Sequence, residues 1–120
     1  ITVDERTIPG ERISMNEMND LAGISHEVNQ DLPPMKCNDE EFANTSRSVA
    51  RDVQDLPARL TVKPHATDAG WLFDAGTSTV IIGPAEMGEA HTAEESVSID
   101  ALTRCRDIYL TMADRWPVSG

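Results

Sequence analysis

The expected fold rests on a short apolar run, Thr79-Val80-Ile81-Ile82, which is followed directly by Gly83-Pro84. The run is rich in β-branched residues and shows no alternation of polar and apolar side chains. This pattern is typical of a strand that is buried on both faces. Because such strands occur mainly in parallel sheets covered by helices, the run predicts a buried strand of an α/β sheet.

A helix is predicted after this strand. Five large side chains recur at steps of 3, 4, 3 and 4, which places them on one buried face: Leu102, Cys105, Tyr109, Met112 and Trp116. Ser98 or Asp100 is expected to cap this helix, and Pro117 is expected to end it.

Two shorter helices are predicted before the strand. One starts at Thr67-Asp68 and runs through about Asp74, with Gly76 just past its end. In the other, Thr45 or Ser46 is the expected cap, and the buried face consists of Val49, Val53 and Leu56. A short strand at residues 60–62 lies between them. Alternating strands and helices over residues 60–116 predict helices packed on a mostly parallel sheet.

The N-terminal part has a different pattern. Residues 1–8 alternate as a half-buried strand that Pro9-Gly10 closes with a turn, and a helix is predicted over about 15–30. The irregular, Pro-containing residues 31–44 are the best candidate for a domain boundary. We therefore expect an α+β domain over residues 1–40 and an α/β domain over residues 41–120.

Charge and cysteine content exclude several classes of protein. With 21 acidic and 10 basic residues, the net charge is −11, which argues against nucleic acid and anionic membranes as partners. Both a salt-rich cytoplasm and an ordinary acidic surface account for this charge. No apolar run approaches the roughly 18 residues of a membrane-spanning helix. The two cysteines form no CxxC motif, which favours free thiols and a cytoplasmic location.

The loop after the predicted strand carries a candidate metal ligand. In open α/β sheets, ligand sites form beyond the carboxyl ends of the strands, and His91 lies in that loop. Neutral imidazole is a common zinc ligand, and Glu94 or Glu95 is placed to brace it. Alternatively, His91 is an ordinary surface residue, because one histidine does not make a metal site. His26 and His65 lack ligand spacing to His91 and are interpreted as structural.

Several motifs together resemble the M20 family of dimetal hydrolases. They are Thr67-Asp68-Ala69, the apolar run with Gly83-Pro84, Ala90-His91-Thr92 with Glu95, and an N-terminal stretch from Val3 to Glu11 that contains Arg6. The family includes acetylornithine deacetylase, succinyl-diaminopimelate desuccinylase, aminoacylases and glutamate carboxypeptidases. Residues 31–58 match its pattern only loosely.

This resemblance implies a role for each motif. It places His91 at the last ligand position of a site for two divalent metal ions, zinc or cobalt, with Glu95 orienting the His91 loop. Arg6 stands where a planar guanidinium holds the carboxylate of the substrate. Thr67 and Asp68 stand beside the substrate pocket, although an ordinary helix cap accounts for them equally well.

The resemblance also implies a function for the whole protein. By this resemblance, the protein would be a cytoplasmic metallohydrolase that cleaves N-acyl amino acids or short peptides. Residues 1–40 would be the second half of a lid domain that forms a homodimer, and residues 41–120 the C-terminal segment of the catalytic domain. The general base and the other metal ligands are not among these 120 residues, so the chain alone is expected to be inactive. The alternative is a non-catalytic dimerisation or interaction module.

Overall fold

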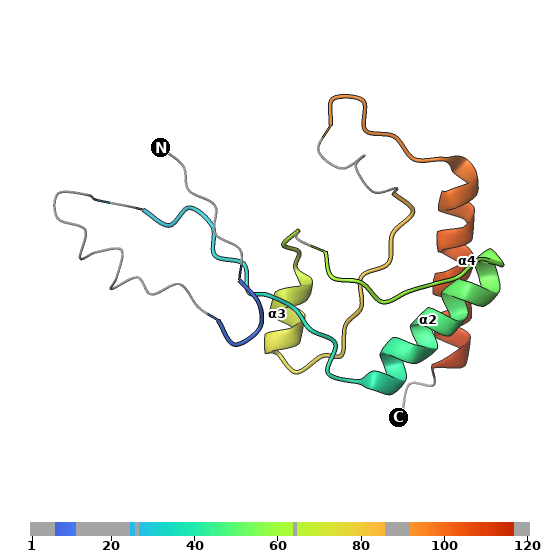
Figure 1. The fold of residues 1–120 in the computed structure, drawn as a ribbon, viewed down its shortest axis with the longest axis horizontal. Helices are drawn as coiled ribbons and strands as arrows, with labels where there is room; N and C mark the ends of the chain where they lie inside the picture. Colours follow the sequence, from blue (N-terminus) through green and yellow to red (C-terminus); the bar gives the residue numbers. More distant parts are fainter. Residues whose placement is uncertain (1–6, 12–24, 26, 64, 86–91, 117–120) are drawn as a thin grey trace. The chain divides into compact units, whose positions relative to one another are not determined.

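The computed structural model describes residues 7–11, 25, 27–63, 65–85 and 92–116. The described residues form three α-helices (Figure 1), which are α2 (Glu40–Gln54), α3 (Ala69–Asp74) and α4 (Ile99–Arg115). None of them is long and apolar enough to span a bilayer. Most of the helix expected over residues 15–30 lies outside the described residues, but residues 27–30 at its expected end are not helical.

The chain divides into two compact units. The first consists of Ile1–Asn38 and Val62–Thr79 and contains α3, whereas the second consists of Asp39–Thr61 and Val80–Gly120 and contains α2 and α4.

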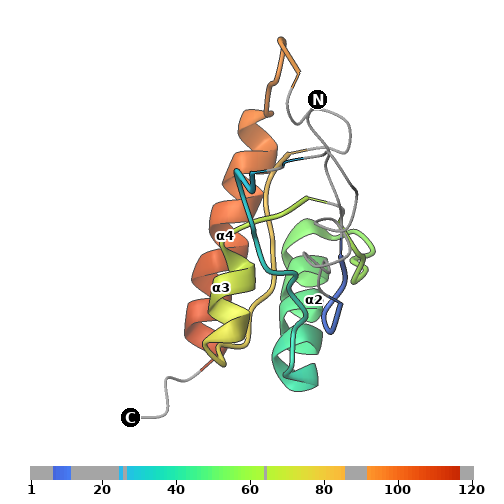
Figure 2. The same cartoon turned by 90° about the vertical axis from the view of Figure 1, so that its left-hand side faces the viewer.

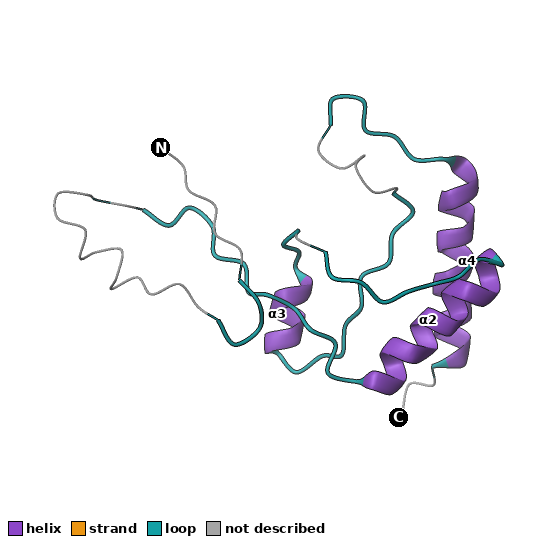
Figure 3. Ribbon diagram, viewed as in Figure 1, coloured by secondary structure: helices purple, strands orange, loops and turns teal. Residues whose placement is uncertain are grey.

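No β-strand is present in the part of the chain that the structure describes (Figure 3), so the expected α/β sheet is wrong. A strand is stable only when its backbone pairs with a neighbouring strand and its apolar face is covered. The predicted strand at residues 60–62 meets neither condition, because Leu60 is 54% exposed and Val62 is 92% exposed.

Helices instead of strands cover Ile82 at the end of the apolar run, whereas Ile81 is 42% exposed. Ile82 packs against the core of the second unit, and its carbonyl oxygen accepts a hydrogen bond from the Tyr109 hydroxyl at 2.5 Å. A hydrogen bond with the Cys105 thiol, and to a smaller extent burial, raises the pKa of the Tyr109 hydroxyl. An apolar β-branched run specifies burial but not the covering element, and this ambiguity explains the wrong prediction.

Helix α2 begins earlier than predicted. The Asp39 carboxylate accepts a hydrogen bond from the Phe42 backbone N–H at 2.9 Å and so caps the helix. The expected cap Ser46 lies inside the helix and is 3% exposed, and its hydroxyl donates to the Phe42 carbonyl at 2.8 Å. Glu40 and Glu41 favour the earlier start, because negative charges in the first turn complement the helix dipole.

The core of the second unit lies between α2 and α4, which run in roughly opposite directions (Figures 1 and 2). Its buried residues are Val49, Ala50 and Ile108, and Val53, Ala58, Ile82 and Met112 pack against them. The predicted burial of Val49 and the packing of Val53 are confirmed. Leu56 is 58% exposed, because the chain leaves the helix at Asp55, where φ is 51°.

Helix α4 has the predicted cap but a different buried face. The Ser98 hydroxyl oxygen accepts from the Ala101 N–H at 3.0 Å. Of the expected face, Cys105 is buried and Met112 packs on the core, whereas Leu102 and Tyr109 are each 53% exposed. Ile108 takes the central position and is 4% exposed.

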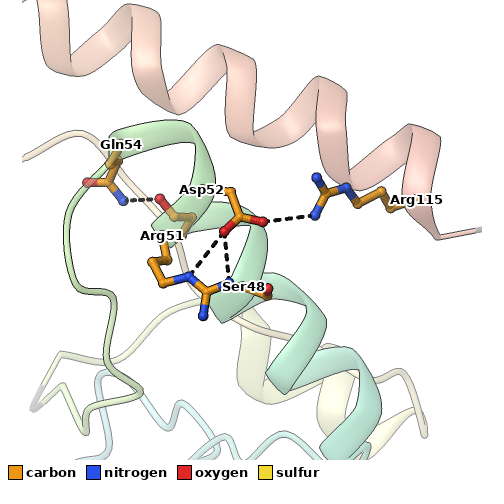
Figure 4. Close-up of polar contacts among 6 residues, drawn as sticks. Ser48, Arg51, Asp52, Gln54 and Arg115 are labelled. Carbon is orange, nitrogen blue, oxygen red and sulfur yellow. Dashed lines mark hydrogen bonds and ion pairs between the residues drawn. The ribbon is translucent and has the colours of Figure 1, made fainter.

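The C-terminal end of α4 contacts both ends of α2. The Trp116 ring meets the Phe42 ring edge to face, with centroids 5.0 Å apart at 72°. Asp52 pairs with Arg51 at 2.8 Å within α2 and with Arg115 of α4 at 3.3 Å (Figure 4). These hydrogen bonds, the one from Arg51 first, lower the pKa of the Asp52 carboxyl.

The Asp52 carboxylate is expected to give the second unit a small acid sensitivity. The pKa of Asp52 is lower in the folded state than its ordinary value of about 3.9. Its contribution to the free energy of unfolding is therefore fully present above about pH 3.9 and is lost as the pH falls through the folded-state pKa. Asp52→Asn should therefore speed amide exchange in α2 and α4 slightly at pH 7, and the difference should shrink as the pH falls below about 3.9 and disappear below the folded pKa. Molar salt should weaken the effect at pH 7, because both side chains are exposed.

Asp107→Asn is the matched control for Asp52→Asn. Asp107 pairs with its chain neighbour Arg106 at 2.6 Å in the same local geometry, but this pair lies within α4. Equal effects of the two substitutions on α2 exchange would contradict a contribution from the link between the helices.

In the first unit, two backbone features match their predictions. The Glu11 N–H donates to the Ile8 carbonyl at 3.0 Å across Pro9-Gly10, and Gly10 has the positive φ of 95° that a type II turn requires. At the end of α3, Gly76 also has a positive φ, 83°. The Gly76 and Thr77 N–H groups each donate at 2.9 Å to carbonyls of the last turn, which forms a Schellman motif.

Candidate functional site

The start of α3 separates the roles of Thr67 and Asp68. The Thr67 hydroxyl oxygen accepts from the Ala69 N–H at 3.2 Å, so Thr67 caps the helix with its side chain. Asp68 is the first residue of the turn, and its carboxylate makes no capping hydrogen bond. Asp68 is also exposed, whereas Thr67 is half-buried. The alternative explanation as a helix cap therefore fits Thr67, and the Asp68 carboxylate is left available for a ligand.

Different effects are expected from substitutions at these two neighbours in the full-length protein. Thr67→Val removes the capping acceptor and should destabilise the start of α3 by about 1 kcal/mol, seen as faster amide exchange at residues 69–72. Asp68→Asn should leave that exchange unchanged. If Asp68 contacts the substrate, the same change should raise KM about ten- to a hundredfold. An unchanged KM would remove Asp68 from the substrate site.

Gly70 is a residue that the sequence interpretation passed over. It is buried in α3, and the position of a Cβ there would overlap the carbonyl oxygen of Pro33. The carbonyl carbon of Pro33 is 2.7 Å from the same position, and its Cγ is 3.0 Å from it. A glycine inside a predicted helix is the signal that points to such a close backbone approach.

The loop of the predicted metal site is described only at its two ends. Gly83 has open space around the position of a Cβ, and the described chain continues to Ala85. It resumes at Thr92, whose carbonyl accepts from the Glu95 N–H at 3.3 Å across a turn. Glu95 is exposed and lies at the end of this turn, four positions after His91. Its predicted role in orienting His91 stays a prediction.

Two predicted site residues, His91 and Arg6, lie outside the described residues. Among the residues that the structure describes, no three His, Cys, Asp or Glu side chains are grouped as metal ligands. The described residues therefore do not form a metal site by themselves, and His91 as a ligand stays a prediction.

An open hollow of about 330 Å³ lies at the C-terminal end of α2. It is lined by Arg51, Asp52, Asp55, Leu56 and Pro57, and it shares no residue with the predicted site. The Asp52 carboxylate in it is already engaged by Arg51 and Arg115. The hollow therefore adds no residue to the predicted site.

The chain is similar to two curated proteins, both N-formyl-4-amino-5-aminomethyl-2-methylpyrimidine deformylases. The protein from Bacillus subtilis is 40% identical over 57 residues, and the one from Halalkalibacterium halodurans is 36% identical over 58 residues. Each match covers 48% of this chain but only 13% and 14% of the respective relative. No solved structure matches the chain significantly.

The pattern of a whole family extends over nearly the entire chain. The model of peptidase family M20/M25/M40 matches residues 2–115, which include the described start of α3, the Thr92–Glu95 turn and all of α4. The resemblance inferred from the motifs is thereby confirmed, and the chain belongs to peptidase family M20/M25/M40.

Proposed function

We propose that the protein carrying this sequence hydrolyses the amide bond of a small N-acyl compound. The observation that carries the proposal is the family match over residues 2–115. The exposed Asp68 carboxylate at the start of α3, which is free of a capping role, supports a substrate contact there. His91 would be a metal ligand, and Glu95 would orient the loop that carries it.

Metal ions, two per site and of zinc or cobalt type, would polarise the scissile carbonyl and activate water when bound. Because a catalytic zinc takes about three protein ligands, His91 would act together with ligands that the described residues do not supply. A glutamate from outside these 120 residues would be the general base. The contribution of this chain is then to hold the metal through His91 and the substrate through Arg6 and Asp68.

Two classes of substrate are supported by different observations. The resemblance of the motifs favours N-acyl amino acids or short peptides, whose carboxylate would pair with the planar fork of Arg6. The names of the two similar proteins favour an N-formylated aminomethylpyrimidine, which has an amide but no carboxylate. We propose amide hydrolysis for both classes and use Arg6 to distinguish them.

The test is to assay the full-length protein against both classes of substrate. The panel contains N-acetyl and N-succinyl amino acids, dipeptides and the N-formyl aminomethylpyrimidine. For a carboxylate substrate, Arg6→Gln should raise KM about ten- to a hundredfold, because a charge-assisted hydrogen bond is lost. For the formyl substrate, the same change should leave KM unaltered. Absence of amide hydrolysis across the panel by the metal-loaded protein would refute the proposed function.

Two further properties belong to the proposal. We expect the full-length protein to be a cytoplasmic homodimer that pairs through residues 1–40. Light scattering of the purified protein measures its molar mass directly, and a monomer at micromolar concentration would contradict this expectation. In that case, the non-catalytic dimerisation module would also lose its support.

A further inference from the structure

Helix α3 is buried in the first unit through its smallest residues. Ala69 and Gly70 are buried, whereas the large side chains of Trp71 and Leu72 are 55% and 48% exposed. Burial of the small side of a helix allows another backbone to approach closely, and Pro33 does so at Gly70. Figure 1 shows the segment that carries Pro33 running past α3 within this unit.

The contact is made by two stiff segments. Pro33 is followed by Pro34, so both φ angles are restricted by their rings, and Pro33 is also kept out of the helical region. Gly70 is the second residue of α3, and its N–H donates to the Thr67 carbonyl at 3.3 Å. A displacement of Gly70 by Pro33 would therefore also move the turn that carries Thr67 and Asp68.

We propose that Gly70 is a positioning residue for Asp68. The first turn of α3 packs against the Pro33 carbonyl, and this contact fixes where the Asp68 carboxylate lies. This inference rests on the proposed function, because Asp68 is assumed to contact the substrate. The missing side chain of Gly70 sets the distance between α3 and residues 33–34. Any Cβ at position 70 pushes the first turn away from Pro33 and shifts the Asp68 carboxylate.

Gly70→Ala in the full-length protein is the main test. By helix propensity alone, alanine is better than glycine by about 1 kcal/mol, so a loss must come from the contact with Pro33. We expect kcat/KM to fall about ten- to a hundredfold, mainly through KM, because Asp68 would contact the substrate away from the bond that breaks. Asp74→Ala is the control on the same helix, since it also changes the helix propensity of α3 but at an exposed residue of its last turn.

A double-mutant cycle with Pro33→Ala separates positioning from a general loss of stability. Alanine at residue 33 removes the ring whose Cγ is close to Gly70 and frees the φ angle, so the segment can retreat at lower cost. Pro33→Ala should therefore restore part of the KM lost in Gly70→Ala. Additive effects on KM would overturn the proposal. A lower amount of active enzyme with an unchanged KM would overturn it too, because that result indicates a structural role alone.

Failure of the proposed function gives a different result. If the wild-type protein hydrolyses no amide, the proposed function fails, and Gly70 then has no reaction for which to position Asp68. The contact between Gly70 and Pro33 is still measured by amide exchange, which Gly70→Ala should accelerate at residues 69–72 and Asp74→Ala should not. If Gly70→Ala leaves both exchange and KM unchanged in an active enzyme, only the inference about Gly70 is overturned.

Discussion

Replacing His91 by alanine in the full-length protein is expected to remove one equivalent of bound metal and most of the activity. Loss of a residue that only braces a metal ligand already costs about ten- to a hundredfold in affinity or activity. Loss of the ligand itself should therefore lower kcat/KM by more than about a hundredfold. Metal content by elemental analysis and activity on the best substrate of the panel are measured on the same preparation.

His65→Ala is the control for this experiment. It removes the same side chain from an exposed position that lacks ligand spacing to His91, so metal content and activity should both stay within about twofold of wild type. If His91→Ala retains its full metal content, His91 is not a ligand, and the metal site suggested by the family resemblance does not use this residue.

Ile108→Ala is expected to have the largest effect on stability. Ile108 is 4% exposed and forms the core of the second unit together with Val49 and Ala50 of α2. Truncation of a buried isoleucine to alanine costs about 2–5 kcal/mol, because transfer free energy is lost and a cavity remains. A loss of about 3 kcal/mol corresponds to roughly hundredfold faster exchange of the protected amides in α2 and α4.

Leu110→Ala is the matched control on the same helix. It removes the same number of carbon atoms, but Leu110 is 60% exposed, so the free energy of unfolding should change by no more than about 0.5 kcal/mol. Similar exchange rates in the two variants would show that Ile108 is not the centre of this core. The pair also tests the corrected face of α4, since the spacing of large residues predicted burial of Tyr109 and not of Ile108.

The helix ends were the most predictable part of the fold. The cap by Ser98 and the left-handed Gly76 after α3 depend on hydrogen bonds between residues within a few positions of each other. The start of α2 was missed although its cap is equally local, because Asp39 lies in a stretch that was interpreted as an irregular boundary. The acidic residues that follow it were the available signal.

Only the residues of the candidate site that belong to family motifs could be predicted from the sequence. The match of the family model confirms the resemblance that the motifs indicated, but the roles of His91 and Arg6 stay predictions, because both lie outside the described residues. For Thr67 and Asp68, the motif left a cap and a substrate contact equally open. The hydrogen bond of Thr67 to Ala69 separates them, since only geometry decides which oxygen meets the N–H.

The sequence by itself determined the family, most of the helix ends and the turn at Pro9-Gly10, because each depends on a local pattern. Only the tertiary structure decided that Ile82 is covered by helices, that Ile108 of α4 is buried, and that Gly70 has no room for a side chain. In each case the contacting residue is distant along the chain. Ile82 and Ile108 pack in the core that contains Val49, and Gly70 contacts Pro33. Periodicity states which residues share a face, but burial depends on what that face meets.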